Sequence, residues 1–378
     1  MKKKIFILSV FVLLVGVVVI YHNYDKSNIL DDTESKVIKK ENTLSMMLET
    51  EAGSGKYEMT TRSDWPTDGY VFNSSLSRCE NGGELAWDDT NKKVIMSGNM
   101  SDKCYVYFDK SPILLADYVK SLYTGIQGEN GIFYHEGYVG DYEYRDAGDN
   151  SYRYLGENPN NYVCFGSEET ICPENNLYRI IGVFNENNHG VEDQKLVKLI
   201  KSTVYGYYAW NTTETADWKT SSLNKILNST FIREQLSGYE NKISNVNWKI
   251  SGFSINDKDG FVDYYYYEEV ANATEVYNAK IGLMYASDYG YAIDYNYWDK
   301  IMTSSNVENN KKNWLYSDSE WIISPITDYS SEIGEISLGY IRKFRITEMS
   351  GVRPTFYLES STIYKSGTGT QSDPIRLS

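Results

Sequence analysis

The first hydrophobic pattern in the chain is an apolar segment from Ile5 to Ile20, interrupted only by Ser9 and Gly16 and preceded by lysine at positions 2–4. A segment of this kind is typical of a helix that crosses a membrane, and the lysines before it predict a cytoplasmic N-terminus. A cleaved signal peptide is the alternative, but it would need small residues where the chain has Val19-Ile20-Tyr21. We therefore expect residues 1–24 to be an uncleaved membrane anchor and the rest to lie outside the cell.

The next part of the chain, residues 25–55, predicts a stalk followed by a short helix. Residues 25–42 are charged and lack periodicity, which is typical of a stalk. Thr43–Glu49 is apolar and rich in Leu and Met, and Gly53 follows it closely. This segment predicts a short helix that ends near the glycine.

Short alternating runs dominate residues 56–110. Gly69–Phe72 and Cys104–Phe108 have the period of two that is typical of strands, and Trp65–Gly69 is a cluster of turn residues. We expect a small β unit here. A unit of this size buries little apolar surface and needs additional stabilisation. A disulfide between Cys79 and Cys104 would supply about 3 kcal/mol.

Residues 111–378 carry both helical and strand periods and predict one larger α+β domain. Ser111-Pro112 is typical of a helix start, and Trp218–Leu236 has apolar residues at helical spacing with a break near Asn228. Leu177–Phe184 and Leu196–Ile200 predict a hairpin. Later strands are expected at residues 280–285, 321–324, 336–346 and 352–358.

The four cysteines fall into two pairs that are close in sequence, Cys79 with Cys104 and Cys164 with Cys172. A metal site would need clustered cysteines or partnering histidines, and the chain has only three histidines. We expect both pairs to form disulfides, which require an oxidising compartment.

Composition narrows the range of partners. The net charge is −15, and no basic stripe is present that could neutralise phosphates, so nucleic acid is not an expected partner. The chain has 35 Tyr but only 12 Phe, and tyrosine suits surfaces where one end of the ring stays in water. Most of these tyrosines are explained as strand formers.

The densest aromatic segments lie between residues 254 and 300 and are the candidate ligand-binding surface. A strand over the tyrosine run would place alternate rings on opposite faces, and one face could stay open. Carboxylates interleave with the later aromatic residues, and this combination suits glycan recognition. An ordinary tyrosine-rich sheet and loop is the alternative. The candidate ligand-binding residues are Tyr264, Tyr265, Tyr266, Tyr267, Tyr295, Tyr297 and Trp298.

Candidate chemistry elsewhere is sparse. Asp257–Gly260 and the acidic residues at 141, 143, 146 and 149 could bind Ca²⁺, but the other ligands of an EF-hand are absent, so solvated loops are the preferred interpretation. We expect no cofactor, no metal and no catalytic residues. Arg353 is expected to be a buried structural residue, and core positions are expected for Trp218, Trp314 and Trp321.

Several motifs in residues 150–360 together resemble a known family. They are Asp217–Asn228, Asn313–Leu315, Trp321–Pro325 and Gly351–Leu358. Their order resembles an uncharacterised family of Trp- and Tyr-rich extracellular domains of Gram-positive bacteria, and it is similar to the C-type-lectin-like fold of the formylglycine-generating enzyme superfamily. The resemblance implies that fold and a binding role. It does not carry over enzymatic roles, because all four cysteines precede the core motifs and too few histidines are present for a metal triad.

The sequence thus predicts a membrane-anchored extracellular binding or adhesion protein, with a small disulfide-stapled β unit and a C-type-lectin-like domain. Its expected partners are the membrane, through the N-terminal helix, and a glycan or surface protein. One alternative is a cell-wall or glycan-directed hydrolase that uses a carboxylate pair. Another is a structural surface component without a small ligand.

Overall fold

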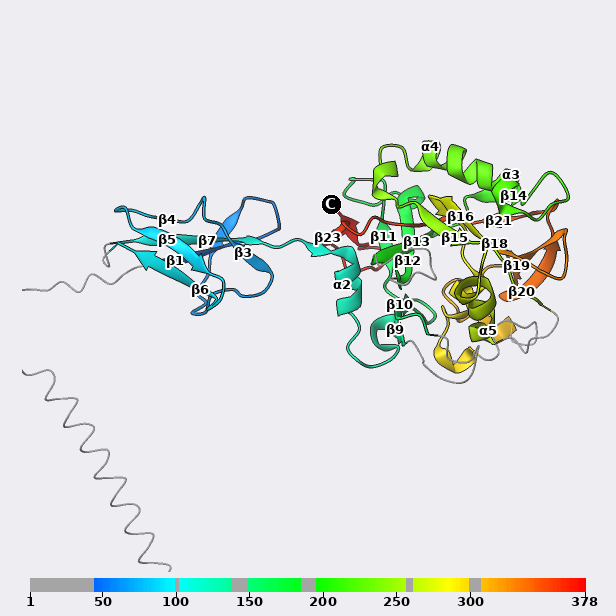
Figure 1. Ribbon diagram of the computed structural model, residues 1–378, viewed down its shortest axis with the longest axis horizontal. Coiled ribbons are helices and arrows are strands. Elements are labelled where there is room, and N and C mark those ends of the chain that lie inside the picture. Colours follow the sequence, from blue (N-terminus) through cyan, green and yellow to red (C-terminus); the bar gives the residue numbers. More distant parts are fainter. Residues whose placement is uncertain (1–43, 99–101, 137–147, 185–194, 256–260, 299–306) are drawn as a thin grey trace, which may run out of the picture. The chain divides into compact units, whose positions relative to one another are not determined.

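The computed structural model describes residues 44–98, 102–136, 148–184, 195–255, 261–298 and 307–378. The chain divides into two compact units, Met1–Lys110 and Ser111–Ser378. Strands predominate, with 37% strand against 18% helix, as the arrows in Figure 1 show. The expectation of an α+β fold class with a C-type-lectin-like domain is therefore wrong, and the protein is mostly β.

The first unit contains a five-stranded sheet in the order β2-β1-β7-β3, with β4 paired to β7, and a separate hairpin of β5 and β6. Its core is formed by Met46, Val106 and Phe108, which alternate with half-buried residues along their strands. The strands are β1 (Leu44–Glu49), β2 (Tyr57–Met59), β3 (Tyr70–Phe72), β4 (Arg78–Cys79), β5 (Glu84–Asp88), β6 (Lys93–Ser97) and β7 (Cys104–Lys110).

Strand β1 corrects the expectation of a short helix over Thr43–Glu49. It pairs in parallel with β7 and antiparallel with β2, so Leu48 lies opposite both Phe108 and Glu58. Leucine and methionine favour helices only weakly, and pairing on both sides outweighs that preference. The segment is a central strand of the sheet because of contacts that are distant in sequence.

The second unit contains a seven-stranded and a five-stranded sheet. The first has the order β17-β22-β13-β12-β10-β9, with β11 paired to β12, and the second has the order β14-β21-β18-β19-β20. Two smaller sheets join β15 to β16 and β24 to β23 and β8. The strands are β8 (Ile113–Leu114), β9 (Ile132–His135), β10 (Ser151–Tyr154), β11 (Tyr162–Cys164), β12 (Leu177–Phe184), β13 (Leu196–Lys201), β14 (Gly206–Ala209), β15 (Val246–Lys249), β16 (Val276–Ala279), β17 (Ile281–Gly282), β18 (Ser319–Pro325), β19 (Glu332–Ser337), β20 (Tyr340–Arg345), β21 (Met349–Val352), β22 (Thr355–Tyr357), β23 (Ile363–Ser366) and β24 (Arg376–Leu377).

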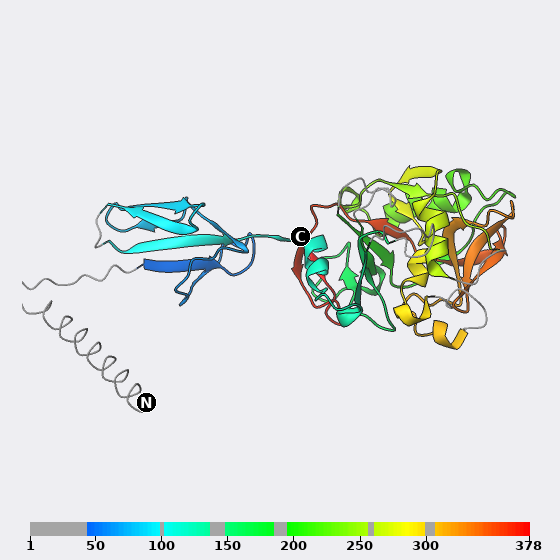
Figure 2. The ribbon, with the colours of Figure 1, turned by 60° about the horizontal axis from the view of Figure 1, so that its bottom comes forward.

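The helices of this unit are short and surround the strands, as Figures 1 and 2 show. The segment Trp218–Leu236, expected to be helical with a break near Asn228, is instead a series of short helices with a π-helical turn at that break. The helices are α2 (Leu115–Ser121), α3 (Ser222–Lys225), α4 (Ile232–Gln235), α5 (Val262–Tyr266), α6 (Ala286–Gly290) and α7 (Val307–Asn310). The π-helices are η5 (Ile226–Phe231) and η7 (Tyr267–Ala271). The 3-10 helices are η1 (Glu129–Gly131), η2 (Glu174–Asn176), η4 (Trp218–Thr220), η6 (Glu240–Lys242) and η8 (Tyr295–Tyr297).

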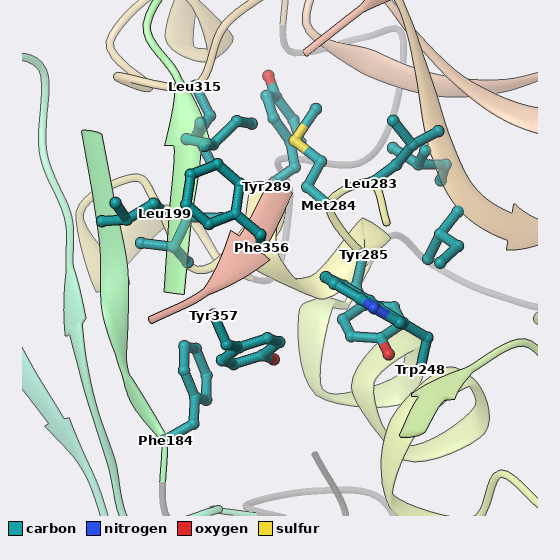
Figure 3. Packing of buried hydrophobic residues seen from close by; sticks show 14 of the residues in the cluster. Phe184, Leu199, Trp248, Leu283, Met284, Tyr285, Tyr289, Leu315, Phe356 and Tyr357 are labelled. Atoms are coloured by element: carbon teal, nitrogen blue, oxygen red, sulfur yellow. The ribbon is translucent and has the colours of Figure 1, made fainter. Parts of the chain in front are cut away.

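The core of the second unit lies around β12 and β13, which pair antiparallel as the expected hairpin. Every residue of both strands is buried, and strands covered on both faces have continuous rather than alternating apolar patterns. Figure 3 shows aromatic rings from distant segments packing together here, among them Phe184, Trp248 and Tyr357. Buried positions are also confirmed for Trp218, Trp314 and Trp321.

The structure contains two disulfides, Cys79–Cys104 and Cys164–Cys172, in the pairing that the sequence predicts. The first joins β4 to β7. The second closes the loop that follows β11. Disulfides persist in oxidising compartments and are rare in the cytosol, so both support a location outside the cytoplasm.

The expected membrane helix is not supported. Within the described parts of the chain, no helix is long and apolar enough to cross a membrane, and the segment Ile5–Ile20 lies outside the described residues. The expectation of a single-pass cell-membrane protein, anchored by a helix at its N-terminus, is corrected by this finding.

Candidate functional site

The tyrosine run at 264–267 does not form the expected strand with an open face. Its first three residues belong to helix α5, and their exposed fractions are 8% for Tyr264, 3% for Tyr265 and 0% for Tyr266. The ring of Tyr265 packs edge-on against Phe253, with 4.7 Å between the centroids. Tyr267 is half-buried at the start of η7. A helix that packs into the core buries these rings, so they are not available to a ligand.

The aromatic residues at 295–298 differ in how far they are exposed. Tyr295 is 50% exposed in η8, whereas Tyr297 and Trp298 are half-buried. The indole nitrogen of Trp298 donates a hydrogen bond to the carbonyl of Ile293 at 3.0 Å, and its ring packs against Tyr291 with 4.7 Å between the centroids. Of the seven candidate residues, Tyr295 is thus the one with a largely exposed ring, and they do not form one binding shelf.

The acidic segments give no evidence of a calcium site. Asp257–Gly260 and the acidic residues at 141, 143 and 146 lie outside the described residues. Asp149 is buried and forms an ion pair with Arg153 at 2.6 Å. Its role in the structure is therefore charge pairing within the core.

One set of metal-type donor atoms comes together in the first unit, at Cys79, Asp102 and Cys104. Both sulfur atoms are joined in a disulfide, so neither is the thiolate that binds a metal. The Asp102 carboxylate accepts hydrogen bonds from the backbone N–H groups of Asn81 and Gly83. This set therefore organises the turn after β4.

Arg353 has the structural role that the sequence predicts. Its guanidinium donates to the carboxylate of Glu320 at 2.8 Å and to the carbonyl of Leu315 at 2.8 Å, and all of this is buried. A fork-shaped donor group suits such a junction, because it satisfies a side chain and a backbone acceptor together.

A cluster of buried charges occupies the core of the second unit. We define it by four residues, Asp149, Arg153, Asp288 and Lys198, which alternate in sign. Arg153 lies 2.6 Å from Asp149 and 3.2 Å from Asp288, and Lys198 lies 2.5 Å from the other oxygen of Asp288. Burial disfavours the charged form of Asp288 and by itself would raise its pKa. The nearby cations Lys198 and Arg153 outweigh this effect and hold the pKa of Asp288 below its usual value.

Aromatic rings enclose the ammonium group of Lys198. Its Nζ lies 4.2 Å from the ring centroid of Tyr285, 5.3 Å from those of Trp248 and Tyr357, and 5.7 Å from that of Phe184. Figure 3 shows Phe184 beside Tyr357 and Trp248 beside Tyr285. Burial lowers the pKa of Lys198, and Asp288 opposes that effect.

A further buried carboxyl, Glu269, lies in the π-helix η7. It accepts hydrogen bonds from the backbone N–H groups of Ser287 at 2.6 Å and Ala286 at 3.1 Å, and from the Ser324 hydroxyl at 2.5 Å. Burial raises the pKa of Glu269 to about 7. Perturbed pKa values are common at active sites, but this side chain is 0% exposed, so it cannot meet a substrate from solution.

An open cleft of about 420 Å³ lies on the surface of the second unit, apart from the buried charges. Three segments form it: the disulfide loop 164–172, residues 239–242, and the C-terminal residues 365–377. The backbone N–H of Cys164 donates to the carbonyl of Ile375, which brings β11 beside the C-terminal segment. The Arg376 guanidinium donates to the carbonyl of Thr170 at 2.8 Å and holds the loop in place.

The cleft combines an apolar residue with charges of both signs. Ile171, the residue directly before Cys172 in the disulfide loop, is 83% exposed, which is unusual for an isoleucine. Tyr239 lines the cleft and packs against the buried Phe165, with 5.6 Å between the centroids. The charged lining residues are Glu168, Glu169, Lys242, Lys365, Asp373 and Arg376.

Comparisons with family models, with curated proteins and with solved structures found no match to this chain. The resemblance to extracellular domains of Gram-positive bacteria therefore stays a prediction.

The residues of the cleft were missed by the sequence analysis, apart from the two cysteines. The pair Cys164–Cys172 was the available signal, because a disulfide restricts the conformation of the residues next to its cysteines, here Ile171 beside Cys172. The other cleft residues lie at 239–242 and at 365–377, far from this loop in sequence, so no local pattern joins them.

Proposed function

We propose that this protein is an extracellular recognition module that binds a segment of another surface protein in the cleft beside the Cys164–Cys172 loop. The observation that carries the proposal is the exposed Ile171, held directly before Cys172 in the disulfide loop next to an open cleft. An ordered apolar residue on a cross-linked loop binds with a low entropy cost, because its conformation is already restricted.

The chemistry of the lining favours a polypeptide over a glycan. Protein segments present apolar side chains together with charges of both signs, and the cleft offers complementary groups for each of these. A glycan site would use an open ring face, but Tyr239 is half-buried against Phe165. Of the aromatic residues expected to bind sugar, three are buried, three are half-buried and Tyr295 alone is largely exposed.

A hydrolase is less well supported by the same cleft. Glu168, Glu169 and Asp373 all line it, so carboxylates are present. However, the Asp373 carboxylate accepts hydrogen bonds from the backbone N–H and the hydroxyl of Thr368, at 3.0 and 2.9 Å, and so organises its own turn. The carboxyl with the strongly raised pKa, Glu269, lies in the core and is 0% exposed. Asp373 thus already serves its own turn, and the carboxyl with the raised pKa is out of reach of a substrate from solution.

The test is selection from a display library of random linear peptides with the full protein, followed by affinity measurement for the selected peptides. Ile171→Asp is expected to weaken binding about tenfold or more, because a charge replaces the apolar contact. Ile126→Asp is the matched control, since Ile126 is also exposed, at 63%, but does not line the cleft. Lys365→Glu and the exposed Lys225→Glu form a second matched pair for the charged contacts.

If Ile171→Asp and Ile126→Asp change the affinity for the selected peptides equally, the cleft is not the binding site. Binding to a glycan array without selection of any peptide would contradict the proposed ligand class. Release of reducing ends from cell-wall polysaccharide by the purified protein would favour the hydrolase instead.

A further inference from the structure

Lys198 and Asp288 place an amine and a carboxyl in direct contact in a part of the core that is closed to solvent. The Nζ atom lies 2.5 Å from Oδ2, and both side chains have an exposed fraction of 0%. No substrate from solution can reach either group. The amine of Lys198 and the carboxyl of Asp288 can therefore react only with each other.

We propose that Lys198 and Asp288 condense after folding into an intramolecular isopeptide bond. This bond would join β13 to helix α6 covalently, as a cross-link in addition to the two disulfides. It is independent of the binding role of the cleft, because none of the cleft-lining residues belongs to the buried charged cluster.

The two reacting groups are held in place from both sides. Asp288 is the third residue of α6, and its Oδ2 also accepts a hydrogen bond from the backbone N–H of Tyr285 at 2.9 Å. Lys198 lies in the centre of the sheet, between Gly182 of β12 and Tyr357 of β22. Positioning of this kind converts a slow bimolecular condensation into a fast intramolecular one, with effective concentrations of about 10⁵ M or more.

Arg153 provides the electrostatic assistance that the reaction needs. One guanidinium nitrogen, Nη1, lies 3.2 Å from Oδ1 of Asp288, the oxygen that does not contact the lysine. As the amine adds to the carboxyl carbon, negative charge develops on Oδ1, and a fixed cation at this distance stabilises it. The side chain of Arg153 is itself anchored by Asp149 at 2.6 Å.

Burial from water favours the reactive protonation state of Lys198. Burial among Tyr285, Trp248, Tyr357 and Phe184 disfavours the ammonium form, which lowers the pKa of the lysine. The neutral amine is the nucleophile. Exclusion of water also protects the amide product from hydrolysis.

The condensation balances without any outside reagent. The Lys198 ammonium transfers one proton to Oδ2 along their hydrogen bond, and the neutral amine then attacks the carboxyl carbon of Asp288. The bond from that carbon to Oδ2 breaks, and Oδ2 leaves as water after taking a second proton from the nitrogen. One N–H remains on the amide, and nothing is oxidised or reduced.

The charge balance of the core also favours the product. Before the reaction the cluster holds two cations, Arg153 and Lys198, and two anions, Asp149 and Asp288. Afterwards one ion pair remains, Arg153 with Asp149. Burying charges carries a large desolvation cost even when they are paired, so replacing one pair by a neutral amide relieves that cost.

The test is mass spectrometry of the full folded protein, reduced and alkylated at all cysteines and then digested with trypsin. Trypsin is expected not to cleave after Lys198. The expected product is a branched peptide that joins the segment around Lys198 to the segment around Asp288, lighter than the sum of the two linear peptides by one water. Recovery of both segments as linear peptides at full mass would overturn the proposal.

Variants provide the controls. Lys198→Arg keeps a positive charge but removes the nucleophilic amine, so the branched peptide is expected to disappear. Lys201→Arg is the matched control on the same strand, because Lys201 is also buried but donates to the carbonyl of Asn175 instead of a carboxylate. The branched peptide is expected to persist in this control. If Lys198→Arg does not fold, the peptide map of the unmodified protein decides the question by itself.

Discussion

The guanidinium of Arg353 lies 2.7 Å from the carboxylate of Glu320 and forms a buried ion pair between β18 and the turn that connects β21 to β22. The same guanidinium donates to the carbonyl of Leu315 at 2.8 Å. Three chain segments therefore depend on one side chain. Burial of the pair makes its removal more costly than the loss of an exposed ion pair would be.

We expect Arg353→Ala to destabilise the second unit by about 3–5 kcal/mol, because Glu320 would stay buried without its cation. Urea unfolding followed by tryptophan fluorescence measures the effect. Arg345→Ala is the control at an exposed position of β20, where a change within about 0.5 kcal/mol is expected. Equal destabilisation by the two substitutions would contradict the structural role of Arg353.

Glu269 makes stability depend on pH. Its pKa is raised from 4.5 to about 7 by burial, so between these values the folded protein binds a proton that the unfolded chain does not. Stability from this group is therefore greatest at low pH and falls as pH rises from about 4.5 to about 7, on the order of 3 kcal/mol in total.

The measurement compares the free energy of unfolding of the unmodified protein with that of Glu269→Gln across this pH range. Glutamine has the shape of the protonated acid and does not titrate. The difference between the two proteins is expected to change across the window from about 4.5 to 7 and to stay constant above it. A difference that is independent of pH would show that the carboxyl titrates normally.

The tyrosine run offers a direct test of burial. Tyr265→Ala is expected to cost about 3–5 kcal/mol, because it removes a ring that packs against Phe253 in the core. Tyr295→Ala removes a ring that is 50% exposed, and we expect a much smaller effect. Thermal unfolding of both variants decides between a core role and a surface role for Tyr265.

The Cys79–Cys104 disulfide is expected to matter most for the first unit, whose core is small. Replacing both cysteines with serine is expected to destabilise this unit by about 2–5 kcal/mol. Limited proteolysis should then cleave between residues 44 and 110 faster than in the unmodified protein. The corresponding replacement of Cys164 and Cys172 is the comparison, and cleavage there is expected only in the short loop that this disulfide closes.

Local patterns in the sequence determined several parts of this protein. The predominantly apolar runs at 177–184 and 196–201 form the buried hairpin of β12 and β13, and both disulfides join cysteines that are close in sequence. The role of Arg353 was predicted from its apolar surroundings. In each case the information lies within a short stretch of chain, where hydrophobic period or spacing reports directly on the structure.

Only the tertiary structure decided the rest. The segment Leu44–Glu49 is a strand because β7, sixty residues away in sequence, pairs with it, and the tyrosine run is a buried helix because the core receives it. The contact between Lys198 and Asp288, and the cleft that residues 164–172 form with the C-terminus, likewise join segments that are far apart. Pairing, burial and charge contacts between distant segments outweigh weak local preferences, and a single sequence does not show which segments will meet.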